Sequence, residues 1–179
     1  MDVRVNKNEK KIEWNVGSRT ITIHNAHVLY AFKHGKNLLM VKEKYESSES
    51  GFSIYDKCGN LVVSYKYLGD SLTFRKVNIA DIKGAIISAD YEEEKRMVII
   101  LKELEETRSL LIYDEQGDFI AEIVSPQGYT FVSLKNSDGN IMVVAQGTSD
   151  MTRDSFGRND WNFVIDFENF YVQKKSITQ

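Results

Sequence analysis

Three histidines are the side chains in this sequence whose type could most simply bind a metal ion. His24, His27 and His34 are the only histidines, and they lie close together along the chain. A zinc site would require them to converge from adjacent hairpins, with a fourth ligand or a water molecule to complete the tetrahedron. Nothing in their spacing enforces that convergence, so we interpret them as ordinary histidines at strand ends. We expect no metal site and no cofactor.

Three aspartates occupy similar places in the sequence and could act either as acids or as turn-forming residues. Asp56, Asp114 and Asp166 each end an apolar segment, and a Gly or Asn follows three residues later, where we expect a positive φ angle. Acids at corresponding positions around a channel could serve catalysis. An Asp at the end of a strand also accepts hydrogen bonds from the backbone of the following turn. Because each Asp stands beside its turn residue, we predict that all three cap turns.

The longest polar connection in the chain is the best candidate for a binding site. Residues Gln146 to Trp161 read QGTSDMTRDSFGRNDW and join two apolar segments. Long loops on rigid β-scaffolds often carry recognition, and Arg together with Trp is typical of interface hot spots. The alternative is an insertion without a binding role. The residues that we predict to bind are Arg153, Asp154, Phe156, Arg158, Asp160 and Trp161.

The sequence contains none of the motifs that mark common enzyme chemistries. It has no Gly-x-Ser-x-Gly, no phosphate-binding Gly-rich loop before a helix, no paired cysteines and no His-Glu-x-x-His. The single cysteine, Cys58, falls in an expected turn and is interpreted as a surface thiol. We therefore predict no catalytic residues and a protein that is not an enzyme.

Composition and charge are those of an ordinary globular protein. Hydrophobic residues make up 42% of the 179 residues, and the formal net charge of -3 indicates neither a nucleic-acid partner nor a membrane partner. One domain, 1–179, is expected, because this length can bury a single core. The lone cysteine, the charged N-terminal segment and the absence of a run of about 20 apolar residues together predict a cytoplasmic protein.

Alternation of apolar and polar residues predicts β-strands along the whole chain. Residues 11–16 and 20–24 alternate with period two across Gly17-Ser18, and 27–33 and 37–44 flank His34-Gly35-Lys36, so the chain is expected to open with two hairpins. No segment is a convincing helix, because the best candidates are rich in β-branched residues.

The hairpins recur at a nearly regular spacing. Asp56 and Asp114 are 58 residues apart, and Asp114 and Asp166 are 52 apart. Propeller blades of about four strands repeat every 40 to 50 residues or so. One four-stranded sheet cannot cover both of its own faces, so successive sheets are expected to stack. The predicted units are an N-terminal hairpin at 11–26 and meanders at 27–70, 71–126 and 127–179.

Two of these units share a short motif, which reads IYDKCG at Ile54–Gly59 and IYDEQG at Ile112–Gly117. The motif, followed by apolar alternation, resembles the outer hairpin of β-propeller repeats in the WD-repeat-like and NHL-like group. The resemblance covers 51–67 and 109–125, and it is weakest at 163–172, where an Asn replaces the Gly. It implies an all-β fold of antiparallel four-stranded meanders stacked as propeller-like blades, about three of them plus the N-terminal hairpin.

The number of units leaves the closure of the stack open, because closed propellers usually have at least four blades. Three arrangements fit: an open arc, a blade completed by the N-terminal hairpin, or a ring formed by two chains. Exposed sheet faces and edges favour self-association, so a homodimer is one expectation.

These observations indicate a non-catalytic protein-binding or assembly module whose partner is another protein of unknown identity. One alternative is an inhibitor or immunity-type protein that neutralises a toxin, which small size, mild acidity and the lack of catalytic motifs would fit. A propeller-type hydrolase is a second alternative, and it would require inward-facing acids or a metal at the channel mouth.

Overall fold

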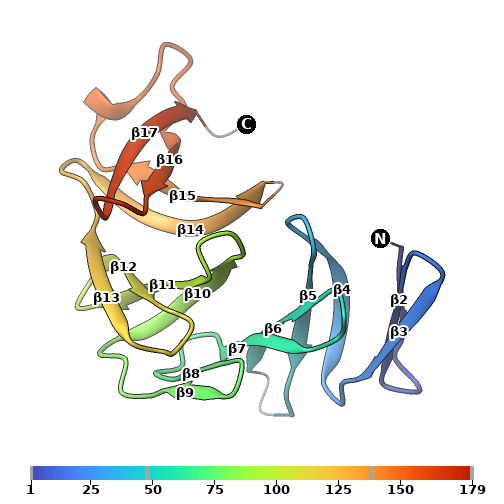
Figure 1. Ribbon diagram of the computed structural model, residues 1–179. Coiled ribbons are helices and arrows are strands. Elements are labelled where there is room, and N and C mark those ends of the chain that lie inside the picture. Colours follow the sequence, from blue (N-terminus) through green and yellow to red (C-terminus); the bar gives the residue numbers. More distant parts are fainter. Residues whose placement is uncertain (1, 47–48, 138, 178–179) are drawn as a thin grey trace.

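The computed structural model is built almost entirely of β-strands (Figure 1). It describes residues 2–46, 49–137 and 139–177. Every strand pair in these ranges is antiparallel, and the strands form four sheets that follow one another in chain order. The one helical element among the described residues is a 3-10 turn, η1 (Asp150–Thr152), and nothing there is a helix long and apolar enough to cross a membrane. The all-β prediction is confirmed.

The first sheet has three strands, and its two faces differ in polarity. Trp14 of β2 is paired with Val3 of β1, and both side chains pack in the apolar core between the first and second sheets. On the other face Lys11 forms an ion pair with Glu13, with 2.8 Å between Nζ and Oε1, and the hydroxyl of Thr22 donates to the same oxygen. The sheet therefore ends the stack with a polar outer surface. Its strands are β1 (Val3–Asn6), β2 (Lys11–Val16) and β3 (Arg19–His24), of which β1 was not expected.

The second sheet is a meander of six strands, two more than expected. The short β8–β9 hairpin pairs with β7, and its residues Leu72 and Phe74 are fully buried against the third sheet, which explains why the sheet is extended. The sheet therefore runs on to Ile79, and the expected unit boundary at residue 70 lies inside it. The strands are β4 (Val28–His34), β5 (Leu38–Lys44), β6 (Ser50–Asp56), β7 (Leu61–Lys66), β8 (Leu72–Phe74) and β9 (Val77–Ile79).

The third and fourth sheets are the four-stranded meanders that the sequence predicts. The third contains β10 (Ala85–Glu92), β11 (Met97–Leu104), β12 (Thr107–Tyr113) and β13 (Phe119–Val124). The fourth contains β14 (Tyr129–Ser137), β15 (Asn140–Gly147), β16 (Asp160–Asp166) and β17 (Tyr171–Ile177).

Three apolar cores lie between successive sheets and hold them together. Strand β11 shows how, because Val98 and Ile100 belong to the core shared with the second sheet, whereas Ile99 and Leu101 belong to the core shared with the fourth. A strand buried on both faces is expected to read as a continuous apolar run. The sheets consequently follow one another along a curve, from β1–β3 at one end to β14–β17 at the other (Figure 1).

Asp56 and Asp114 cap the turns between the third and fourth strands of their meanders. Each carboxylate Oδ1 accepts hydrogen bonds from the backbone N–H groups two and four residues later, at 2.8 to 2.9 Å. Gly59 and Gly117 take φ angles of +88° and +85°, which a residue with a Cβ adopts only with strain. The predicted role of these two aspartates is confirmed.

Asp166 also caps a turn, but the turn has a different form. Its Oδ1 accepts from the backbone N–H groups of Glu168 at 2.8 Å and Asn169 at 3.0 Å. The positive φ angle, +53°, falls on Phe170, so the expectation that Asn169 would carry it is wrong. The second hydrogen bond comes from the amide three residues after the aspartate, not four as in the other two turns. The residue with the left-handed φ angle is accordingly the fourth after the aspartate and not the third.

Candidate interaction site

The predicted binding loop, the β15–β16 loop (148–159), projects away from the fourth sheet (Figure 1). It begins with η1 and continues into a second turn centred on Asp154. The loop has no β-strand of its own, so its shape depends on side-chain and turn hydrogen bonds.

Asp154 builds a turn of the same form as the Asp turns of the second and third sheets. Its Oδ1 accepts from the backbone N–H groups of Phe156 at 2.9 Å and Arg158 at 2.8 Å, and Gly157 takes a φ of +77°. The other carboxylate oxygen lies 2.8 Å from the guanidinium of Arg158. Burial raises the pKa of Asp154, but the hydrogen bonds from Arg158 and Phe156 outweigh it and hold this pKa below its ordinary value.

The base of the loop is fastened to the fourth sheet by three polar side chains. Trp161 Nε1 donates to the carbonyl of Thr152 at 2.8 Å, and the Thr152 hydroxyl donates to Asn159 Oδ1 at 2.8 Å. Asn159 in turn donates to the carbonyl of Gly147 at 2.6 Å. A Cβ atom at Gly147 would overlap the Thr152 hydroxyl, so the loop can close only over a glycine.

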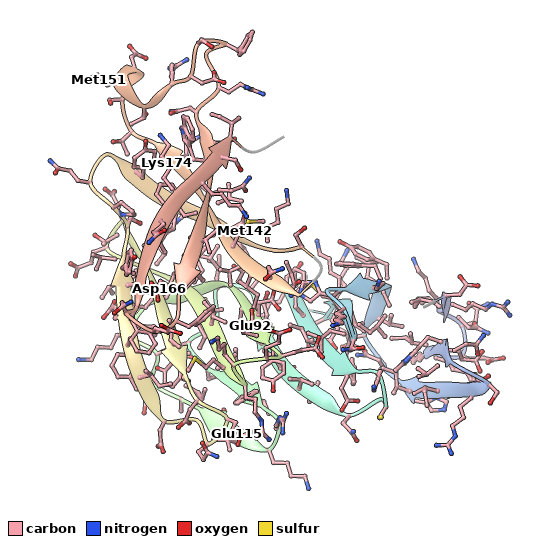
Figure 2. The ribbon with its side chains drawn as sticks, turned by 45° about the horizontal axis from the view of Figure 1, so that its top comes forward. Glu92, Glu115, Met142, Met151, Asp166 and Lys174 are labelled. Carbon is pink, nitrogen blue, oxygen red and sulfur yellow. The ribbon has the colours of Figure 1, made fainter. Side chains whose placement is uncertain are left out.

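The indole of Trp161 is partly buried. It packs against the apolar cluster between the third and fourth sheets. Lys174, labelled in Figure 2, covers its ring, with Nζ 3.2 Å from the ring centroid, and also donates to the hydroxyl of Tyr129 at 2.6 Å. Trp161 therefore anchors the loop.

Two large apolar side chains on this loop face the solvent. Met151 is 96% exposed and Phe156 is 81% exposed, and Figure 2 shows Met151 on the outer part of the loop, away from the sheets. The guanidinium of Arg158 lies over the ring of Phe156, 5.3 Å from its centroid. The loop thus presents apolar surface from a backbone that is held by turn hydrogen bonds and by the bond from Trp161.

The structure places the six predicted binding residues in different roles. Asp154, Arg158 and Trp161 shape or anchor the loop, and Phe156 is presented to solvent. Arg153 forms an ion pair with Asp150 at 3.0 Å, and Asp160 accepts from Gln146 at 3.3 Å. Sequence reasoning missed Met151, whose only signal was an isolated apolar residue in a polar segment.

The three histidines do not converge. The ring of His27 lies 4.4 Å from that of Tyr45, whereas His24 is exposed at the end of β3 and His34 contacts Asp90. Within the ranges that the structure covers, no three His, Cys, Asp or Glu side chains are placed to hold a metal ion.

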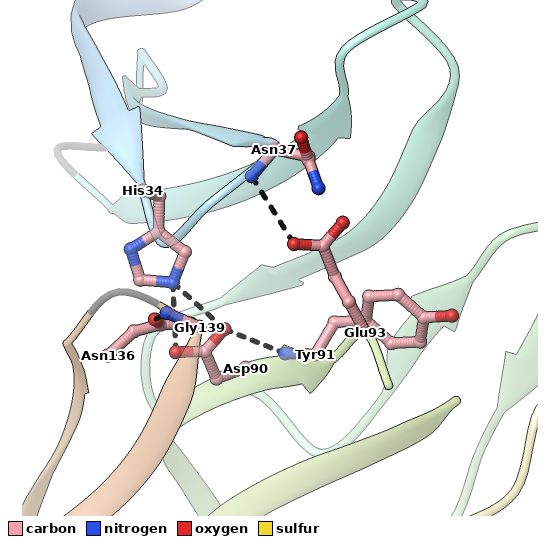
Figure 3. A network of polar contacts seen from close by, with 7 residues as sticks. All are labelled: His34, Asn37, Asp90, Tyr91, Glu93, Asn136 and Gly139. Carbon is pink, nitrogen blue, oxygen red and sulfur yellow. Dashed lines mark hydrogen bonds and ion pairs between the residues drawn. The ribbon is translucent and has the colours of Figure 1, made fainter. Parts of the chain in front are cut away.

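His34 joins the second sheet to the third through a part-buried contact with Asp90 (Figure 3). Its Nε2 lies 2.8 Å from both carboxylate oxygens of Asp90, which is 2% exposed and also accepts the backbone N–H of Tyr91 at 2.7 Å. Nearby, the backbone N–H of Asn37 donates to Glu93 at 3.3 Å. Removing His34 would leave the buried Asp90 side chain short of a hydrogen-bond partner, so the contact helps to fix how the two sheets meet.

A second buried acid stands two residues further along β10. Glu92 is 7% exposed, and burial raises the pKa of its carboxyl above the ordinary value, although the backbone amides of Glu94 and Ile141 partly oppose the rise. Asp90 and Glu92 lie on the same face of the strand, because side chains two apart do. They border different cavities, however: Asp90 the one beside His34, and Glu92 the one between the third and fourth sheets.

A cavity of about 840 Å³ lies between the second and third sheets on the side of the Asp56 turn. The acidic and basic side chains that line it are equal in number, and both of its arginines already bind other side chains of the protein. Arg75 donates to the hydroxyl of Tyr91 at 3.1 Å, and Arg96 forms an ion pair with Glu115 at 2.7 Å. The cavity therefore does not favour a ligand of either charge.

No model of a protein family matches the chain, and no curated protein does either.

Proposed function

We propose that the protein is a non-catalytic protein-binding module, an open stack of blade-like sheets, similar to part of a β-propeller, that offers the β15–β16 loop to another protein. The observation that carries the proposal is the exposure of Met151 and Phe156 on a loop held by its own hydrogen bonds. Exposed cysteine Cys58, unpaired in a turn, fits a reducing compartment such as the cytoplasm.

Preorganisation is the physical reason for assigning binding to this loop. Ordering a flexible loop on association costs free energy, and a loop that is already fixed avoids most of that cost. Met151 and Phe156 are costly to expose to water unless a partner covers them. Arg158, held by Asp154 and lying on the ring of Phe156, adds the kind of side chain that is enriched in hot spots.

The polarity of the first sheet bears on the homodimer that the sequence suggested. The Lys11–Glu13 ion pair and the Thr22 and Thr20 hydrogen bonds cover the outer face of that sheet. A polar terminal face is what keeps an open repeat stack from self-associating. We therefore propose a monomeric arc, and light scattering that gave twice the 20.6 kDa chain mass would contradict it.

The proposal is tested by capturing partners from the source cells with three purified proteins. These are the wild type, the double variant Met151→Ser/Phe156→Ser, and the matched control Phe119→Ser/Val124→Ser, which removes two exposed apolar residues from β13. A partner should be retained by the wild type and the control and lost by the loop variant. Since hot-spot truncations cost about 2 kcal/mol or more, its affinity should fall at least about 30-fold. Partner sets that are the same for all three proteins would refute the assignment.

A hydrolase is the second candidate, and the acids of β10 favour it. Asp90 and Glu92 are both buried side chains of β10, and the raised pKa of Glu92 is a feature of acid catalysts. Two carboxylates that share a reaction must reach the same substrate, and here they border different cavities. We therefore rank this candidate below protein binding. A hydrolase screen in which turnover is lost in Glu92→Gln would reverse that ranking.

A further inference from the structure

The cavity beside His34 and Asp90 has a volume of about 330 Å³ and lies between the second sheet and β10. Strands β4 to β7 form its floor, and the opposite wall comes from β10 with Leu134 of β14. Phe32 and Tyr67 border the cavity and are 41% and 45% exposed, so it is open to solvent. Its volume is near the lower end of the range for small-molecule sites, which suits a compact ligand and is small for a peptide.

Strand pairing brings a row of aromatic side chains to the face of the second sheet that forms this floor. Lys42 of β5 pairs with Tyr30 on one side and with Phe52 on the other. Phe52 pairs in turn with Tyr65, and their rings are stacked with centroids 5.4 Å apart. Residues directly opposite in adjacent strands share a face of the sheet. Because Phe52 and Tyr65 line the cavity, the row extends its aromatic floor to Lys42.

Lys42 is the one charged residue of this row, and it has no acidic partner. Its Nζ lies 5.7 Å from the ring centroid of Phe52 and 5.8 Å from that of Tyr30. The residue is half-buried, and in the part of the chain that the structure describes no carboxylate lies within ion-pair distance of its ammonium. An anion brought to this ammonium would therefore gain a charge-assisted hydrogen bond without displacing a partner.

The ammonium of Lys42 can reach a ligand in the cavity. Met40, which lines the cavity, precedes Lys42 by two residues on the same face of β5, a separation of about 7 Å. The lysine side chain is a flexible four-carbon stem with a charged end. It can therefore turn from the rings of Tyr30 and Phe52 toward an anionic group placed over Met40.

The acid that lines the cavity lies at the opposite end from Lys42. Asp90 is 2% exposed, and its carboxylate already contacts His34 Nε2 and accepts the backbone N–H of Tyr91. His34 is paired with Leu38, which is four residues and about 13 Å from Lys42 along β5. An anion held at Lys42 is consequently far from the buried carboxylate.

We propose that this cavity binds a free aromatic carboxylate of two fused rings, with the rings against the aromatic floor and the carboxylate paired with Lys42. Aromatic rings open to a concave space offer flat surfaces on which ligand rings can stack. A cavity of about 150 Å³ holds one benzene ring, and this one is roughly twice as large. The unpaired ammonium selects an anion over a neutral or cationic molecule of the same shape.

The test is a fluorescence titration at neutral pH with two probes of matched shape, 2-naphthoate and the uncharged 2-naphthamide. The wild type should bind 2-naphthoate more tightly by about 3- to 10-fold, the factor expected for one ion pair at a partly exposed lysine. In Lys42→Gln this preference should disappear while the affinity for 2-naphthamide is kept.

Lys33→Gln is the matched control, because it removes the same charge from the opposite face of the second sheet. Lys33 is paired with Leu39, which packs against the first sheet. This variant should keep the preference for 2-naphthoate. Phe32→Ala should instead weaken both probes alike, by about 3-fold or more, because it removes a ring that borders the cavity.

Two further measurements separate the result from any effect on folding. Lys42→Gln should unfold within a few degrees of the wild type, since Lys42 has no ion pair to lose. In the wild type the preference should shrink as salt rises from about 0.01 M to about 1 M, because the Debye length falls from about 30 Å to about 3 Å.

Several outcomes would overturn the proposal. Absence of saturable 2-naphthoate binding would remove the site. Equal affinity for the two probes in the wild type would indicate a neutral occupant. A preference that persists in Lys42→Gln, or that does not change with salt, would show that Lys42 does not hold the carboxylate, and probe binding unchanged in Phe32→Ala would place it outside this cavity.

Discussion

The Asp114 turn and the Asp154 turn have the same pattern of hydrogen bonds but different places in the fold. In both, the carboxylate accepts from the amides two and four residues later, and a glycine in the left-handed region stands between those amides. The Asp114 turn closes two paired strands and touches the second sheet at Val77. The Asp154 turn lies outside every sheet.

The two turns also differ in the side chain that each presents to solvent. The position two after the aspartate is Gln116 in one turn and Phe156 in the other, and Phe156 is 81% exposed. A turn that only joins strands can display a polar residue at no cost. Local turn chemistry thus fixes the shape of the backbone, whereas function depends on which side chain the shape presents.

The two turn glycines should respond very differently to substitution. Gly117→Ala places a Cβ 2.6 Å from Cγ1 of Val77, a side chain with little rotamer freedom, and forces alanine into a left-handed φ. We expect it to lower the free energy of unfolding by about 3 kcal/mol. Gly157→Ala has the same φ problem but meets nothing within 4 Å, so its effect should be about 1 kcal/mol and confined to the loop.

Urea unfolding followed by circular dichroism measures the first effect, and amide exchange of the β15–β16 loop measures the second. Equal losses of global stability in the two variants would show that the Asp154 turn belongs to the cooperative unit, against the distinction drawn above.

Replacing Asp114 or Asp154 by alanine should give a smaller difference in stability between the two turns than the glycine substitutions do. Asp114→Ala leaves two turn amides without their acceptor in a hairpin of the third sheet, and we expect a loss of about 1 to 2 kcal/mol. Asp154→Ala loses the same bonds, yet global stability should change by less than about 0.5 kcal/mol because the loop is outside the sheets. Partner binding should respond in the opposite order, with Asp154→Ala the more damaging, and a binding defect confined to Asp114→Ala would contradict the proposed site.

The sequence predicts the strands well, because alternation and turn residues are local signals. Hairpins such as β2–β3 around Gly17-Ser18 and the caps at Asp56 and Asp114 follow directly from it. The sequence suggested one short strand at 71–77 where the structure has the β8–β9 hairpin, because three-residue strands are too short to show a period and the hairpin turns at Arg75, a non-glycine residue with a φ of +54°.

The candidate site was only partly predictable, for a physical reason. The loop could be located, and the motif DSFGR at Asp154–Arg158 does repeat the Asp and Gly spacing of the two better turns. Which side chains of the loop face inward depends on long-range contacts such as that between Trp161 and Lys174. The cavity beside His34 and Asp90 is lined by residues of three sheets, so no local pattern could reveal it.

Acidification should melt the Asp154 turn while the sheets persist, which is the smallest effect and the sharpest separation of the two turns. The pKa of Asp154 in the folded loop is held below its ordinary value of about 4 by the hydrogen bonds from Arg158 and Phe156, which outweigh burial. A group whose folded pKa is lowered stabilises the folded form above its ordinary pKa, and this contribution is lost as the pH falls through the lowered value. Exchange of the Phe156 and Arg158 amides should therefore accelerate below about pH 4, whereas amides of β11 stay protected.

The control is Asp154→Asn, whose side-chain oxygen still accepts but does not titrate in this range, so its loop amides should show no acid transition. An acid transition of the same amides in Asp154→Asn would assign the melting to another group and remove the Asp154 carboxylate as the residue that holds the loop.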